Sequence, residues 1–134
     1  MTAPRIGAER GRWAEELVAA RLVAAGWQVL GRGVHAGRSE LDLVAVDPGP
    51  PRRLVVVEVR CRSSRAFGLP EETLDARKQA FLRRGVARLL EAGRLPDGHP
   101  LPRLPIGLDL VVVEPSRRGG GEPKVRHHRD VLGG

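Results

Sequence analysis

Three acidic residues, Glu40, Asp42 and Glu58, are the side chains best suited to chemistry in this sequence. Glu40 and Asp42 are two residues apart, so on a strand both side chains leave the same face. Glu58 lies in the apolar run LVVVEV, and hairpin pairing of the two segments would bring it beside Asp42. Carboxylates held together need a proton or a cation to offset their repulsion and desolvation. A hard cation such as Mg²⁺ fits this need, because it takes oxygen ligands, can bind a phosphate and makes a nearby water more nucleophilic.

A purely structural interpretation of the same residues stays open at this point. Asp42 and Glu58 could mark strand ends, with Arg60 and Arg62 pairing with them. Acid-x-acid and Glu-x-Arg are common short strings, so their spacing does not decide between the two interpretations. Under the catalytic interpretation, Arg60 follows Glu58 on the same face of the strand and contacts the phosphate.

The elements that position these acids follow from the spacing of apolar residues. Helical spacing predicts two helices, and runs rich in Val and Leu predict four strands. In chain order, they are a helix over 9–25, strands over 27–31, 41–46 and 54–59, a helix over 71–91 and a strand over 106–113. Residues 54–59 are too continuously apolar for a sheet edge, which predicts a central strand.

The order αβββαβ predicts an α/β fold with a mixed sheet flanked by helices, because hairpins join the early strands and a helix precedes the last. We expect a single domain over 1–134, with a core at about 8–114. Residues 115–134 are predicted to form a flexible basic tail, in which 124–132 could add an edge strand. The adjacent His127 and His128 are a poor metal pair, since on a strand they point to opposite faces, and we expect them in that tail.

The charge of the chain favours a polyanionic partner. The formal net charge is +7 and the pI about 11.2, which predicts binding to DNA or another nucleic acid. However, 21 of the 23 basic residues are arginine, a bias that genome composition can produce without selection for binding. Cys61 is the one cysteine, and no apolar stretch suits a signal peptide or a membrane span. These features predict a cytoplasmic protein without membrane contact.

Several motifs, in this combination and order, resemble the YraN-like family of uncharacterised proteins. They are Gly11-x-x-x-Glu15 followed by Leu22, Gly26 and Trp27, the string SELDLVA at 39–45, VEVRCR at 57–62, Pro70, Lys78 and the strand LDLVV at 108–112. The resemblance implies a restriction-endonuclease-like fold with a PD-(D/E)xK signature, similar to Holliday-junction resolvases. It therefore implies a metal-dependent nuclease.

The resemblance also implies roles for individual residues. Asp42 and Glu58 match the metal-binding acids, and the backbone carbonyl of Val59 is a further candidate metal ligand. Glu40 matches the acid that precedes them in the signature. Glu15 matches a helix carboxylate that supports the same site. The expected cofactor is Mg²⁺ or Mn²⁺.

Arg60 departs from the signature, which has lysine at this position. A lysine can lose its proton and help to activate water, whereas arginine stays protonated and cannot act as a general base. Arg60 can still bind a phosphate or stabilise charge in the transition state. The departure predicts impaired catalysis, unless Lys78 supplies the missing ammonium from the second helix.

Three functions remain open from the sequence. The first is a DNA endonuclease, which as a homodimer could cut two strands with its two sites. The second is a non-catalytic nucleic-acid-binding module, and the third is an interaction protein whose charge is compositional. Under the first two, the predicted nucleic-acid contacts are Arg62, Arg83, Arg84 and Arg88.

Overall fold

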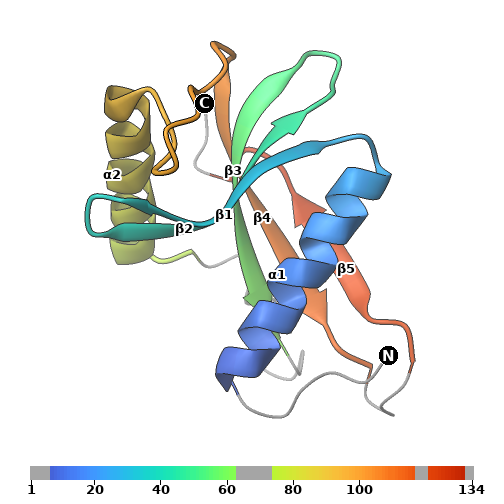
Figure 1. Cartoon of the computed structure of the whole chain (residues 1–134). Coiled ribbons are helices and arrows are strands. Elements are labelled where there is room, and N and C mark those ends of the chain that lie inside the picture. The colour runs from blue at the N-terminus through green and yellow to red at the C-terminus, as the bar shows by residue number, and fades with distance from the viewer. Residues whose placement is uncertain (1–6, 63–73, 117–120, 132–134) are drawn as a thin grey trace.

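A five-stranded mixed sheet with a helix on each face forms the fold (Figure 1). The computed structural model describes residues 7–62, 74–116 and 121–131. Its strands follow the order β1-β2-β3-β4-β5; β3 and β4 are parallel and the other neighbours antiparallel. In chain order the elements are α1 (Gly7–Ala24), β1 (Gln28–Ala36), β2 (Ser39–Asp47), β3 (Arg53–Cys61), α2 (Ala76–Ala92), β4 (Ile106–Glu114) and β5 (Lys124–His128). The predicted α/β class is confirmed, and β3 is the central strand.

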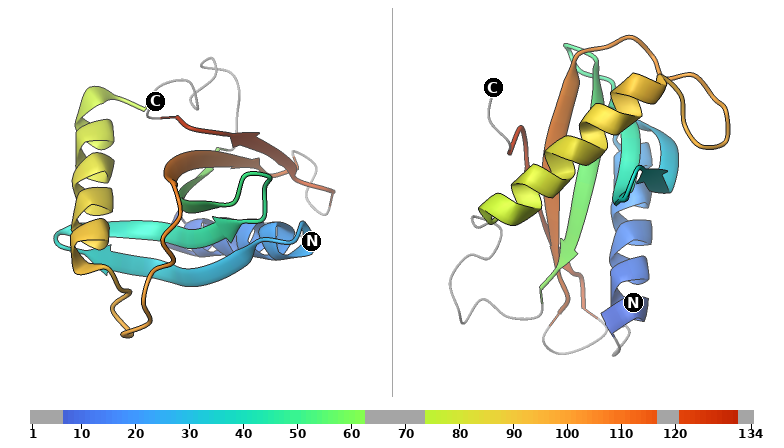
Figure 2. Two further views of the ribbon diagram at one scale, coloured as in Figure 1. Left: turned by 90° about the horizontal axis from the view of Figure 1, so that it is seen from above. Right: turned by 90° about the vertical axis from the view of Figure 1, so that its left-hand side faces the viewer.

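The central strand β3 contributes to two separate hydrophobic cores. Leu54 and Val56 pack in the core that contains the α2 residues Leu82 and Leu89. Val55 and Val57 pack in the core that contains residues of α1. Alternation along the strand therefore explains the continuous apolar run, because each face has a helix to bury against. Figure 2 shows α2 lying across the strands.

The second helix begins later than the sequence predicted. Asp75 has extended backbone angles, and its side chain accepts a hydrogen bond from the amide of Lys78 at 2.7 Å. This cap satisfies an amide that has no helical partner, so the helix starts at Ala76. Residues 71–73 of the predicted helix lie outside the described part of the chain. Neither α1 nor α2 is long and apolar enough to cross a bilayer.

One strand is longer than predicted, and the edge strand that 124–132 could add is present over a shorter range. β1 runs to Ala36 instead of ending at Gly31, because the turn that closes the hairpin is Gly37-Arg38. At the other end of the chain, Lys124–His128 form β5 along one edge of the sheet, paired with β4. The edge strand foreseen in this part of the tail is therefore present, and these residues are not a flexible segment.

The hairpin formed by β1 and β2 leaves the rest of the sheet at one place, which we call the branch point. Pairing between β2 and β3 ends at Leu43 and Val57, whereas β3 continues beside β4 to Cys61. β2 continues beside β1 to Ser39, where the hairpin turn approaches α2 (Figure 1). Beyond the branch point, β3 thus has a partner strand on only one side. Asp42 is the β2 residue next to Leu43, where the pairing with β3 ends, and so is the first unpaired one beyond the branch point.

A close approach to α2 holds the hairpin in this position. The Ser39 hydroxyl donates a hydrogen bond to the carbonyl of Phe81 at 3.2 Å. A β-carbon at Gly85 would lie 2.8 Å from that of Ser39, so only glycine fits here without displacing the hairpin. The contact fixes β2 away from β3 and thereby maintains the branch point.

Candidate functional site

Three carboxylates from three elements meet at the branch point, and we call Glu15, Asp42 and Glu58 the acidic cluster. Asp42 Oδ2 accepts a hydrogen bond of 2.8 Å from the backbone amide of Val59. The carboxylate takes the place that a β2 backbone carbonyl would occupy if the strands stayed paired. The amide and carbonyl of one strand residue point to the same neighbouring strand, so the Val59 carbonyl also faces the open side.

Glu58 is buried in an environment that disfavours its charge. The residue is 6% exposed, and its Oε2 atom has no hydrogen-bond partner among the described residues. Burial, followed by the charge of Asp42, raises the pKa of Glu58 to about 7, and the Lys78 ammonium opposes this rise. Two ionised carboxylates only accept hydrogen bonds, so contact between Glu58 and Asp42 requires a shared proton or a cation.

Glu15 approaches the same place from α1. Burial, then a hydrogen bond to Asp42 and the charges of Asp42, Glu40 and Glu58, raise the pKa of Glu15 to about 7. Its approach agrees with the supporting position that the resemblance implied. The cluster therefore contains two groups that exchange protons near neutral pH, an environment typical of catalytic sites.

Lys78 reaches the acidic cluster from the first turn of α2. Its Nζ atom lies 3.3 Å from Glu58 Oε1, and the ammonium also lies 5.5 Å from the centre of the Phe81 ring. The cap at Asp75 starts the helix at a position that directs Lys78 toward β3. An ammonium is thus present at the acidic cluster, although it comes from a different element than the signature lysine.

Arg60 is half-buried on β3, two residues beyond Glu58 and on the same face of the strand. Burial, then repulsion from Arg62, lowers the pKa of Arg60, and the carboxylates of Glu58, Asp75 and Asp42 oppose the change. Arginine has such a high intrinsic pKa that the side chain stays cationic at neutral pH. Arg60 can therefore pair with an anion but cannot accept a proton.

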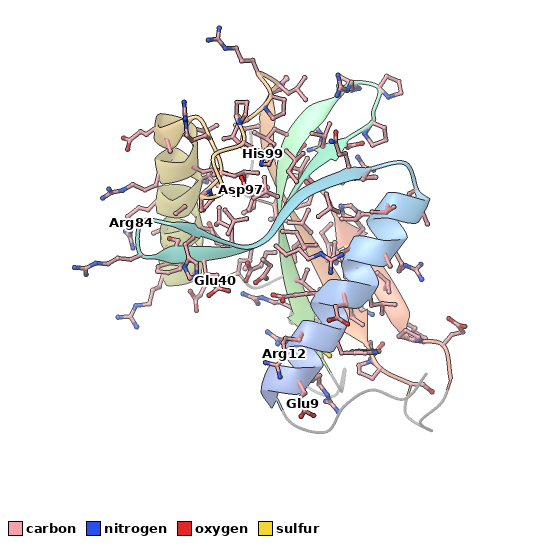
Figure 3. The ribbon with its side chains drawn as sticks, in the orientation of Figure 1. Glu9, Arg12, Glu40, Arg84, Asp97 and His99 are labelled. Atoms are coloured by element: carbon pink, nitrogen blue, oxygen red, sulfur yellow. The ribbon has the colours of Figure 1, made fainter. Side chains whose placement is uncertain are left out.

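The other predicted site residues lie farther out. Glu40 is exposed on the hairpin. In Figure 3 it lies on the lower side of the hairpin, which is also the side of the N-terminal half of α1. It influences the acidic cluster through its charge on Glu15. Arg62 donates a hydrogen bond of 3.3 Å to the carbonyl of Cys61. On α2, Arg84 and Arg88 share one side, whereas Arg83 points about 100° away from Arg84.

A divalent cation fits the donor set of the acidic cluster. Asp42, Glu58 and the Val59 carbonyl offer the oxygen ligands that Mg²⁺ and Mn²⁺ prefer. A cation would also supply the partner that buried Glu58 Oε2 lacks. Over residues 7–62, 74–116 and 121–131, no three or more His, Cys, Asp or Glu side chains are arranged to hold a metal by themselves. Mg²⁺ commonly binds through one or two carboxylates and completes its shell with water and phosphate.

Comparison with known families matches residues 14–113 to "Uncharacterised protein family UPF0102". The chain belongs to the UPF0102 family. Among its relatives, a UPF0102 protein of Herpetosiphon aurantiacus is 33% identical over 123 residues, covering 90% of this chain and 91% of the relative. One from Symbiobacterium thermophilum is 38% identical over 111 residues, covering 81% and 85%. Another, from Syntrophotalea carbinolica, is 34% identical over 117 residues, covering 87% and 85%. The resemblance to the YraN-like family is thereby confirmed.

The UPF0102 match extends from within α1 to the end of β4. It therefore includes the whole acidic cluster together with Arg60 and Lys78. β5 follows the matched residues, so the family comparison covers the site but not the C-terminal edge of the sheet.

A second polar cluster, which sequence analysis missed, connects β5 to the sheet of this UPF0102 chain. Asp109 on β4 is fully buried and accepts hydrogen bonds from His127 Nε2 at 2.8 Å and from the Asp130 amide at 3.1 Å. Arg53 approaches the same carboxylate at 3.3 Å and also pairs with the Asp130 side chain at 3.1 Å. The prediction that His127 lies in a solvated tail is therefore wrong. Its side chain instead pairs with a buried acid.

Asp47 extends this second cluster to the end of β2. Its Oδ2 atom lies 2.9 Å from Arg53 and 2.9 Å from Arg129, and its Oδ1 accepts the Gly49 amide. Burial alone would raise the pKa of Asp47, but the Gly49 amide, Arg53 and Arg129 hold it below its usual value. We call the whole set the Asp109 network: Asp47, Arg53, Asp109, His127, Arg129 and Asp130. Asp109, an acid in the apolar run LDLVVV, was its only sequence signal.

Proposed function

We propose that this chain is a metal-dependent, nuclease-like protein that hydrolyses phosphodiester bonds in DNA. One observation carries the proposal: Glu58 Oε2 is buried without a hydrogen-bond partner among acids whose charges repel. A folded protein retains such an arrangement at a cost in stability, which is typical of sites that bind a cation or transfer protons. The cytoplasm, where DNA and free Mg²⁺ occur together, is the compartment that suits this activity.

Asp42, Glu58 and the Val59 carbonyl would hold Mg²⁺ or Mn²⁺. When bound, the cation would polarise the phosphate and lower the pKa of a coordinated water. Glu15, with a pKa of about 7, can accept a proton from water at neutral pH and is the candidate general base. Arg60 would bind a phosphate oxygen, since a guanidinium offers several donors in a fixed geometry. Lys78 would hold Glu58 in position through its contact of 3.3 Å.

Replacing Glu58 tests the proposed function most directly. We expect Glu58→Gln to lower the cleavage rate at least tenfold, because the amide removes a charge from the cation site while keeping the shape of the side chain. The measurement is cleavage of labelled duplex, single-stranded and branched DNA with Mg²⁺ or Mn²⁺. Glu91→Gln, on the exposed C-terminal turn of α2, is the matched control and should leave the rate unchanged. A parent protein inert on every substrate, or equal activity of both variants, would refute the assignment.

A second candidate function is a nucleic-acid-binding module that has lost turnover, and Arg60 in the lysine position favours it. If Arg60 blocks catalysis, Arg60→Lys should restore it, because lysine can shed its proton in a low-dielectric site and arginine cannot. We expect the Arg60→Lys protein to cleave at least tenfold faster than the parent in the same assay. Slower cleavage by this variant would show instead that the guanidinium itself contributes to catalysis.

A further inference from the structure

Three arginines form a straight line along α2. Residues seven and eleven positions apart on an α-helix differ by only about 20° in direction. Arg77, Arg84 and Arg88 have this spacing, and all three are exposed. Figure 3 shows Arg84 pointing away from the body of the molecule. We call these three residues the α2 arginine line.

The α2 arginine line runs from the end of α2 nearest the acidic cluster to the turn of the hairpin. At its start, Arg77 lies in the first turn of α2, one residue before Lys78, whose ammonium contacts Glu58 from a direction about 100° round the helix. At its end, Arg88 lies against the turn, since a β-carbon at Gly37 would be 3.3 Å from Arg88 Cγ. The line therefore begins at the end of α2 that lies nearest the candidate site and leads away from that end in one direction.

The charges on this line are available to an external anion. In the parts of the chain that the structure describes, no ion pair joins Arg77, Arg84 or Arg88 to a carboxylate. A depression of about 350 Å³ lies between the hairpin turn and the C-terminal end of α2. His35, Arg88 and Arg94 are among its lining residues, so it extends the basic surface past the last turn of the helix.

We propose that the α2 arginine line binds the backbone phosphates of one DNA strand, on one side of the phosphate that reacts. The inference rests on the proposed function for the position of that phosphate. From Arg77 to Arg88 the helix rises about 16 Å. One strand of duplex DNA advances about 3.4 Å along the axis per nucleotide while it winds round that axis, so a straight line of this length follows fewer than about five phosphates of the strand. The substrate is thus a DNA with a duplex arm that leads away from the site.

Removal of the three charges tests this binding surface without requiring cleavage. The protein carries Arg77→Ala, Arg84→Ala and Arg88→Ala together, and the probe is a fluorescent 20-base-pair duplex in EDTA. Each lost phosphate contact should lower the slope of log K against log salt by about 0.9, so we expect the slope to fall by about 2 to 3. Affinity in low salt should fall at least tenfold. Fluorescence anisotropy over a series of salt concentrations measures both quantities.

The matched control removes the same net charge elsewhere, at the exposed residues Arg21, Arg52 and Arg103. It should bind within about twofold of the parent, and thermal melting checks that both proteins remain folded. Equal losses in the two triple variants, or no binding by the parent, would overturn the inference. The two proposals are separable. If the parent cleaves DNA but the triple variant of the arginine line keeps the parent's salt slope, only the arginine-line proposal is refuted. If the triple variant shows a reduced slope but the parent does not cleave in Mg²⁺ or Mn²⁺, only the nuclease proposal is refuted.

Discussion

Replacing Asp109 with alanine should destabilise the protein by about 3 to 5 kcal/mol, since removal of one member of a buried ion pair leaves its partners uncompensated. Asp109 is 0% exposed and accepts hydrogen bonds from His127, Arg53 and the Asp130 amide. Burial by itself would raise the pKa of Asp109, but these bonds outweigh it and hold the pKa below its usual value. Urea denaturation at pH 7 measures the loss in the free energy of unfolding.

Asp130 provides an internal control for this prediction, because both acids contact Arg53. The Asp130 side chain is 65% exposed, so its pair with Arg53 is screened by water. Asp130→Asn, which tolerates the left-handed backbone at φ 51° as aspartate does, should cost less than about 1 kcal/mol. Similar losses in the two variants would contradict the view that burial gives Asp109 its importance. If Asp109→Ala does not fold, Asp109→Asn, which keeps the size of the side chain, allows the same comparison.

The parent protein should lose stability as pH rises from 5 to 8, with Glu58 contributing up to about 3 kcal/mol. The pKa of Glu58 is about 7 in the folded state against an ordinary value of 4.5. Between these values the folded state binds more protons than the unfolded state, so the contribution of Glu58 to stability is complete below pH 4.5 and is lost as pH rises through 7. Glu15 has the same direction of shift but is only half-buried, so its contribution is smaller. Urea denaturation at several pH values gives the slope.

Glu58→Gln separates the contribution of Glu58 to the pH dependence of stability from the contributions of the histidines and the other acids. The amide does not ionise, so the variant should show a flatter pH dependence and be more stable than the parent at pH 8. Asp47 and Asp109 act in a different window, because carboxylates with lowered pKa values lose their stabilising effect only as pH falls below about 4. Mg²⁺ should restore stability to the parent at pH 8 but not to the variant. Parallel pH profiles for the two proteins would contradict the burial of a charged Glu58.

Local patterns in the sequence predicted the fold class, the central position of β3 and the neighbouring positions of Asp42 and Glu58. These features depend on alternation along strands and on a short hairpin connection, both of which are readable within a few residues. The proximity of Lys78 to Glu58 was only one possibility before the structure. It depends on where α2 begins, and the Asp75 cap sets that position through its own backbone conformation.

The Asp109 network could not be predicted from local patterns. Arg53 and Asp109 are 56 residues apart, and they meet only because β3 and β4 pair in one particular parallel register. His127 joins them through the pairing of β5 with β4, from a segment whose glycine-rich approach indicated a flexible tail. The extent of β1 was missed for a related reason. The predicted strand ended at residue 31, whereas β1 accommodates Gly33 at a positive φ of 54° and continues.

The hydrogen bond between Asp42 and the Val59 amide has a consequence for how such chains diverge. Because this carboxylate replaces a missing strand partner, Asp42 supports the fold as well as the proposed chemistry. Glu58 does the opposite, since its burial is costly without a cation or proton. In a lineage that abandoned catalysis, selection for folding alone would retain Asp42 and allow Glu58 to drift toward an apolar residue. An acid at position 42 is thus informative about ancestry, whereas an acid at position 58 is informative about present activity.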